Sequence, residues 1–181
     1  MARSDTPSEP DFALHPDPDR ARADAEQLFE RISLELARIL PASADIRHVG
    51  ATAVRGCLTK GDLDIVVRVA AEDFIAADAA LAGRFARNVG SKRTETFLSF
   101  EDDATSPHLG IQLTVAGGAD DYFHLFADAL GRDPELVARY NALKRRFDGK
   151  PMDVYRAAKS AFIRDVLGRP GGRDLPPARR R

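Results

Sequence analysis

Two aspartates near the middle of the chain, Asp62 and Asp64, are separated by a single apolar residue. In an extended strand, side chains alternate between the two faces, so both carboxylates project from one face while Leu63 and Ile65 project from the other. Carboxylates held this close repel each other unless a cation lies between them, and hard oxygen ligands suit Mg²⁺ or Mn²⁺. The spacing predicts a metal site, and its alternative is a strand with one solvated face.

A turn of small residues, Gly50-Ala51-Thr52, precedes the two aspartates. Glycine allows backbone N–H groups to approach an anion closely, and Thr52 adds a hydroxyl donor. The turn therefore predicts a phosphate-binding site beside the aspartates. A simple strand exit is the alternative interpretation of the same residues.

The remaining pattern supplies the elements that must position these residues. Asp17 followed by Pro18 is typical of a helix start, and an apolar stripe at helical spacing predicts a helix that ends before Pro41. Strands are predicted at 45–49, 62–69, 94–100 and 109–115, an alanine-rich helix at 70–85, and amphipathic helices at 119–130, 134–147 and 152–167. This order predicts an α+β (mixed α/β) fold with a small mixed sheet flanked by helices and a helical C-terminal third.

Bulk properties limit the class of protein. A length of 181 residues fits one domain, and the Pro-, Gly- and charge-rich ends predict disordered tails at 1–16 and 168–181 around a domain at 17–167. The 27 Lys and Arg residues against 28 Asp and Glu argue against a nucleic-acid partner. A single cysteine, no apolar run of membrane length and no signal-peptide core predict a cytoplasmic protein without a membrane partner.

Together, the turn and the aspartate strand resemble the polymerase-β-type nucleotidyltransferase superfamily, in which a Gly-Ser turn precedes an Asp-x-Asp strand. The closer similarity is to the GrpB-like proteins. Their pattern His-Val-Gly-Ser-Thr-x-Val-Pro-Gly, followed by Lys and an Asp strand, is similar to the segment from His48 to Gly56 with Lys60. Their helical region and closing helix are similar to YFHLFADALGRDPELVARYNALKRRF and YRAAKSAFIRDVL, so the resemblance covers about residues 46–167.

The resemblance implies a nucleotidyltransferase-like fold that holds Mg²⁺ or Mn²⁺ and a nucleoside triphosphate, and that transfers a nucleoside monophosphate to an unknown acceptor. The implied catalytic residues and metal ligands are Asp62 and Asp64. The implied nucleotide- and phosphate-binding residues are Gly50, Ala51, Thr52, Arg55, Lys60, Lys144 and Lys159. As alternatives, Lys60 simply pairs with the aspartates, and Lys144 and Lys159 are solvated helix lysines.

Two positions depart from the superfamily pattern. Ala51 replaces the usual serine, which removes a hydroxyl donor but leaves the backbone N–H. The strand at 110–115 presents Gln112 and Thr114 on the face where an active member carries a third acid. The alternative to an enzyme is therefore a catalytically inactive binding or regulatory module with the same fold.

Overall fold

The structure is a computed structural model and describes residues 10–168. Of the tails predicted at 1–16 and 168–181, residues 1–9 and 169–181 lie outside the described residues. The elements in chain order are α1 (Pro18–Ile39), β1 (Asp45–Val49), η1 (Ala51–Ala53), β2 (Leu63–Val69), η2 (Ala71–Asp73), α2 (Phe74–Ala82), β3 (Ala86–Arg87), β4 (Phe97–Asp102), β5 (Leu109–Val115), α3 (Phe123–Arg132), α4 (Pro134–Phe147) and α5 (Met152–Leu167). None of the helices within 10–168 is both long and apolar enough to cross a membrane.

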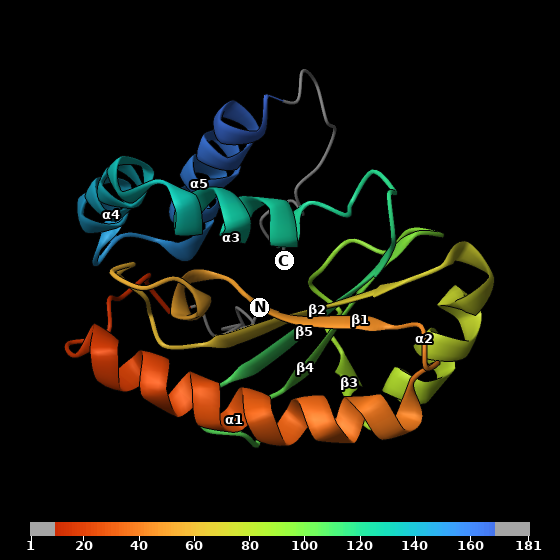
Figure 1. Cartoon of the computed structure of the whole chain (residues 1–181). Coiled ribbons are helices and arrows are strands. Elements are labelled where there is room, and N and C mark those ends of the chain that lie inside the picture. The colour runs from red at the N-terminus through yellow and green to blue at the C-terminus, as the bar shows by residue number, and fades with distance from the viewer. Residues whose placement is uncertain (1–9, 169–181) are drawn as a thin grey trace, which may run out of the picture.

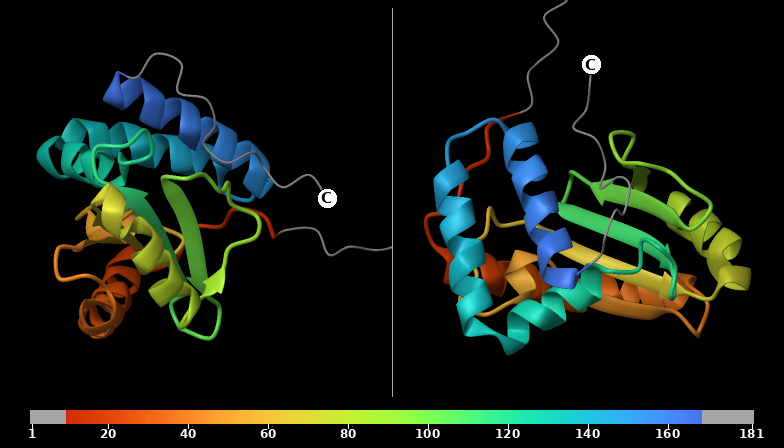
Figure 2. Two further views of the ribbon diagram at one scale, coloured as in Figure 1. Left: turned by 90° about the vertical axis from the view of Figure 1, so that its right-hand side faces the viewer. Right: turned by 90° about the horizontal axis from the view of Figure 1, so that it is seen from above.

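The five strands form one mixed sheet in the order β1-β2-β5-β4-β3. The β2–β5 pair is parallel and the other pairs are antiparallel. Helices α1 and α2 cover one face of the sheet, and α3, α4 and α5 cover the other (Figures 1 and 2). The α+β prediction with a helical C-terminal third is confirmed.

The first helix forms as the sequence predicts. The Asp17 side chain accepts a hydrogen bond from the Arg20 N–H at 3.0 Å, Pro18 occupies the first turn, and the helix ends at Ile39 before Pro41. Its buried side chains recur at helical spacing and pack on the sheet: Ala21, Ala25, Leu28, Ile32 and Leu36. This packing builds the main hydrophobic core on the α1/α2 face.

Strand β2 lies inside the sheet and is covered on both faces. Leu63, Ile65 and Val67 belong to the core on the α1/α2 face. Because successive side chains point to opposite faces, Asp64 and Arg68 lie on the face covered by α3, α4 and α5. The central strand therefore carries a carboxylate beneath the C-terminal helices.

Three predicted boundaries are corrected by the structure. The helix predicted at 70–85 begins with the 3₁₀ turn η2, and the short strand β3 follows it. The strand predicted at 94–100 is shifted to Phe97–Asp102, because its register is set by pairing with β5. The helix predicted at 119–130 starts at Phe123, after a turn that contains Gly117 and Gly118. Tertiary pairing and turn chemistry decide these ends.

The segment before α1 packs on the C-terminal helices although the sequence predicts a tail up to residue 16. Phe12 is 1% exposed, stacks on Tyr155 with ring centroids 3.7 Å apart, and forms an isolated bridge with Lys150. The described chain is thus anchored before residue 17.

A partly buried ion-pair network fixes the start of α3 above the sheet. Arg68 donates from Nε and Nη2 to the two carboxylate oxygens of Asp121 at 2.6 and 2.8 Å, and from Nη1 to Asp45 at 2.7 Å. Asp121 also accepts from the Gly117 N–H at 2.7 Å. Burial by itself would raise the pKa of Asp121, but the hydrogen bonds from Arg68 and Gly117 outweigh it and lower the pKa.

We predict that Asp121→Asn destabilises the fold by about 2 kcal/mol, because it leaves the partly buried Arg68 guanidinium without its bidentate partner. Folding lowers the pKa of Asp121. The ionised Asp121 therefore stabilises the fold above the unfolded pKa near 3.8, and this stabilisation is lost as the pH falls through the folded pKa. Urea unfolding across the acid range should show a smaller difference between wild type and variant at the lowest pH.

The control is Asp45→Asn, whose carboxylate is more exposed and shares the same arginine. It should cost clearly less than Asp121→Asn at neutral pH. Equal losses in the two variants would contradict the assignment of Asp121 as the main partner.

Candidate functional site

A cavity of about 270 Å³ lies between the sheet and helices α3, α4 and α5, and we call it the interlayer cavity. Residues from every one of these elements line it. They are Val49, Gly50, Ala51, Asp64, Ser91, Phe97, Ser99, Gln112, Tyr122, Phe123, Phe126, Tyr140, Arg156, Lys159, Ser160 and Ile163. The wall is mostly apolar with a few polar groups, which is typical of small-molecule sites.

The Asp64 carboxylate occupies a gap that two glycines leave open. A Cβ atom built on Gly50 would lie 2.5 Å from Asp64 Oδ2, and one built on Gly110 would lie 3.3 Å from Oδ1. Gly110 is the direct neighbour of Asp64 on β5. Gly50 has φ +76° and ψ −169°, a conformation that only glycine adopts without strain. Gly50 therefore needs the absence of a side chain, whereas a side chain at Gly110 would only crowd the carboxylate.

Asp64 has no hydrogen-bond donor among residues 10–168, although it lies beneath a layer of helices. Burial raises the pKa of Asp64, and the charge of Lys159 on α5 opposes that shift. Lys159, Arg156 and Ser160 line the same cavity. A carboxylate with a perturbed pKa that faces cationic side chains in a cavity is a candidate functional group.

Beside Asp64, Gln112 on β5 presents a second acceptor. Its Oε1 atom is buried and has no hydrogen-bond partner within the described part of the chain. Aromatic rings form the helical side of the cavity, where Tyr122 and Phe123 stack with centroids 4.5 Å apart. The site thus combines two acceptor groups, cationic side chains and flat apolar surfaces.

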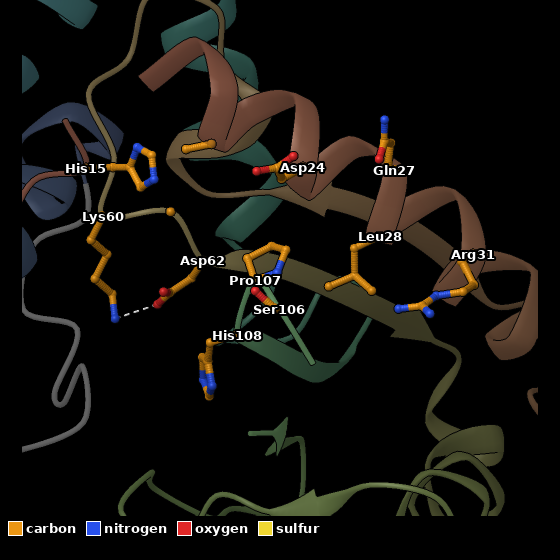
Figure 3. A pocket seen from close by; sticks show the side chains of 12 residues that line it. His15, Asp24, Gln27, Leu28, Arg31, Lys60, Asp62, Ser106, Pro107 and His108 are labelled. Atoms are coloured by element: carbon orange, nitrogen blue, oxygen red, sulfur yellow. Dashed lines mark ion pairs between the residues drawn. The ribbon is translucent and has the colours of Figure 1, made fainter. Parts of the chain in front are cut away.

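The second predicted aspartate, Asp62, lines a different cavity of about 590 Å³, which we call the edge cavity. This cavity lies between α1, the loop that contains Lys60, and the residues just before β5 (Figure 3). Lys60 Nζ is 2.5 Å from Asp62 Oδ2. The lysine thus forms an ion pair with the aspartate, which the sequence analysis gave as the alternative to phosphate binding. The two aspartates therefore line different cavities, although the charge of Asp62 contributes to the raised pKa of Asp64.

Thr52 and Arg55, two predicted phosphate ligands, lie outside both cavities. Thr52 is buried, and its hydroxyl donates to the carbonyl oxygen of Asp62 at 2.9 Å while lying 3.0 Å from His48 Nε2. This bond ties the glycine turn to the start of β2. Arg55 is exposed on the loop that follows η1.

Lys144 is buried inside the helical layer and does not line either cavity. Its ammonium lies 3.1 Å from Cys57 Sγ, donates to the Leu58 carbonyl oxygen and lies 3.8 Å from the centroid of the Tyr140 ring. Burial lowers the pKa of Lys144 to about 8. The sequence carried a signal for this burial, since Lys144 follows Tyr140 at helical spacing on an apolar face.

Of the predicted site residues, the structure brings Gly50, Ala51, Asp64 and Lys159 together around the interlayer cavity. Sequence reasoning missed Gly110, Arg156 and Ser160. The position of Gly110 beside Asp64 follows from strand register, which the sequence does not display.

We predict that Gly50→Ala destabilises the fold by about 1–3 kcal/mol and displaces the Asp64 carboxylate, because the new methyl group meets Oδ2. Gly117→Ala is the matched control, since Gly117 also has φ +76° but has nothing within 4 Å of the added atom. Urea denaturation should show a loss for both variants and a larger one for Gly50→Ala. Equal losses would contradict the contact with Asp64.

We also predict that Asp64→Asn stabilises the fold at neutral pH by roughly 1 kcal/mol, because it removes a charge whose burial is unfavourable. Folding raises the pKa of Asp64. The wild-type fold is therefore most stable with a protonated Asp64, below the unfolded pKa of 3.8, and it loses this stability as the pH rises through the folded pKa. The gain should therefore shrink at low pH in thermal unfolding experiments. Asp62→Asn removes a charge that raises the pKa of Asp64 but also breaks the partly exposed ion pair with Lys60, so its gain should be smaller.

Comparison with known proteins gives the same family as the sequence motifs. The pattern of the GrpB protein family matches residues 20–169. A UPF0157 protein of Vibrio cholerae is 35% identical over 151 residues, which cover 83% of this chain and 79% of that protein. A UPF0157 protein of Streptomyces coelicolor is 32% identical over 142 residues, covering 73% of this chain and 72% of that protein.

Solved structures show the same fold. The crystal structure of GrpB from Enterococcus faecalis matches with a TM-score of 0.65 and 18% identity over 80% of this chain and 90% of that chain. A mutant of the Cid1 poly(U) polymerase bound to MgATP matches with a TM-score of 0.50 and 13% identity over 72% of this chain and 42% of that chain. The predicted nucleotidyltransferase fold is therefore confirmed, and the chain belongs to the GrpB family.

Proposed function

We propose that the protein binds a nucleoside triphosphate together with Mg²⁺ in the interlayer cavity and transfers a nucleoside monophosphate to an acceptor. The observation that carries this proposal is the Asp64 carboxylate, held in a glycine-lined gap opposite Lys159 without a donor from the described residues. Such a group lacks a structural partner and faces a cavity of small-molecule size.

The residues of the interlayer cavity fit Mg²⁺. This ion prefers oxygen ligands and commonly binds through one or two carboxylates together with substrate phosphates and water. Asp64 would supply the carboxylate, and the unpartnered Gln112 Oε1 is a second oxygen. When bound, Mg²⁺ would neutralise charge on the phosphates.

The protein's own side chains account for the rest of the binding. Lys159 and Arg156 on α5 offer positive charge to a triphosphate, and Ser160 offers a hydroxyl. Tyr122 and Phe123 offer ring faces against which a nucleobase can stack. The backbone at Gly50 and Ala51 allows close approach of the phosphates.

In the proposed reaction, an acceptor hydroxyl gives its proton to water and its oxygen forms a bond to the α-phosphorus, while the bond from that phosphorus to the bridging oxygen breaks and pyrophosphate leaves. The chain would contribute mainly by orienting the two reactants. The nucleotidyltransferase fold supports this reaction class, and the Cid1 polymerase of similar fold is bound to MgATP.

A second candidate function is a noncatalytic nucleotide-binding module. The observation that favours it is the acid content of the site: among the described residues, Asp64 is the one acid that lines the interlayer cavity. Asp62 lines the edge cavity, and β5 carries Gln112 in place of a third acid. Such a module would bind the nucleotide without turnover.

We predict that calorimetric titration with ATP, CTP, GTP and UTP detects binding of at least one nucleotide that is tighter with Mg²⁺ than without it. Asp64→Asn should abolish the Mg²⁺ dependence, and Lys159→Gln should weaken binding by about tenfold, because it removes a desolvated charge beside the phosphates. The exposed residues Asp165 and Lys150 provide matched controls, and Asp165→Asn and Lys150→Gln should leave affinity unchanged.

The same titration of Asp62→Asn tests the second predicted metal ligand, since an unchanged Mg²⁺ dependence would remove Asp62 from the metal site. Absence of binding by all four nucleotides would overturn the proposed function. Pyrophosphate release from a bound nucleotide, measured with candidate hydroxyl acceptors, separates the two functions. Release that Asp64→Asn abolishes supports transfer, and binding without release supports the noncatalytic module.

A further inference from the structure

Three potential metal ligands meet where the hairpin of β4 and β5 closes. They are Glu101 near the end of β4, Asp103 in the loop and His108 directly before β5. One ligand atom from each lies within 4.8 Å of the others, and no other such group of three occurs within residues 10–168. His108 Nδ1 and Asp103 Oδ1 are already 3.0 Å apart.

The hairpin holds these side chains in place. Antiparallel pairing aligns Glu101 with Gly110 and Asp102 with Leu109, so the two strand ends are fixed beside each other. The Thr105 hydroxyl lies 3.0 Å from the Asp102 carbonyl oxygen and 2.9 Å from the Pro107 carbonyl oxygen, which closes the loop between them. The three side chains are therefore held by paired strands and by a loop that the Thr105 hydroxyl closes.

An ion pair alone does not account for this arrangement. The Asp103–His108 contact would satisfy those two groups, but Glu101 is half-buried and has no hydrogen-bond or ion-pair partner among the described residues. The Glu101 carboxylate is a second carboxylate beside the aspartate–histidine pair, and it raises the local negative charge. A bound cation would remove that repulsion.

We propose that Glu101, Asp103 and His108 bind one divalent transition-metal ion, for which Zn²⁺ is the best fit. An imidazole nitrogen with two carboxylates matches Zn²⁺, whereas Mg²⁺ favours oxygen ligands alone. Around a tetrahedral zinc ion, ligand atoms lie about 3.4 Å apart. The side chain of Asp103 is 82% exposed and is free to adjust to that spacing.

This site is separate from the interlayer cavity and does not depend on the nucleotide proposal. His108 lines the edge cavity together with Lys60 and Asp62, and Figure 3 shows all three among its lining side chains. An ion bound to His108 would border that cavity. Zinc with three protein ligands keeps an open position, where water or a ligand oxygen can bind.

The test is calorimetric titration of the full, untagged chain with Zn²⁺ and, separately, with Mg²⁺. We expect one equivalent of Zn²⁺ to bind with saturation and Mg²⁺ to bind at this site more weakly. Glu101→Gln and His108→Gln should each weaken Zn²⁺ binding at least tenfold, since even residues outside the ligand shell commonly have that effect. Co²⁺ should produce a visible absorption spectrum in wild type that both variants lose.

His15→Gln is the matched control, because His15 also lines the edge cavity but is not one of the three ligands. It should bind Zn²⁺ like wild type, and so should Asp64→Asn, which alters only the interlayer cavity. The proposal is overturned if wild type shows no saturable Zn²⁺ site, or if His15→Gln and His108→Gln lose binding equally. Circular dichroism of each variant establishes that it is folded before titration.

Discussion

A carboxylate beneath a layer of helices is unfavourable unless something compensates its charge, and Asp64 occupies that position. The described residues supply no hydrogen bond to it, and Lys159 acts on it only through its charge. The glycines at 50 and 110 keep the space around both oxygens clear of side chains. The local structure thus keeps a carboxylate without a hydrogen-bond donor inside a cavity at a cost in stability, which is characteristic of sites selected for binding.

The rest of the fold can be understood as the support of that carboxylate. The core on the α1/α2 face fixes one side of β2, and the Arg68–Asp121 pair fixes the start of α3 over the other side. The Thr52 hydroxyl binds the Asp62 carbonyl oxygen, so the glycine turn and the start of β2 are held together. In this structure, the Thr52 hydroxyl contributes to positioning the glycine turn.

Asp62 and Asp64, the two aspartates by which the strand was recognised, lie in two different environments. Asp64 faces the interlayer cavity, whereas Asp62 pairs with Lys60 at the edge cavity. The GrpB family shares its fold with nucleotidyltransferases, but a shared fold leaves the chemistry of each site open. In this member, an amide on β5 stands near the single acid of the interlayer cavity, and a separate Glu-Asp-His group lies at the closing end of the hairpin.

The amino-acid sequence by itself determined the local features. Capping at Asp17, the alternation along β2 and the family motifs from His48 to Gly56 follow from residue type and short spacing, so the fold class and the family could be predicted, and Asp64 could be named as a candidate site residue. Only the tertiary structure decided three features. Asp62 and Asp64 line different cavities, Lys144 is buried, and Glu101 lies close to His108. The physical reason is that each feature depends on strand register or helix packing between segments far apart in the chain. Register and packing cannot be recognised from a short stretch of sequence.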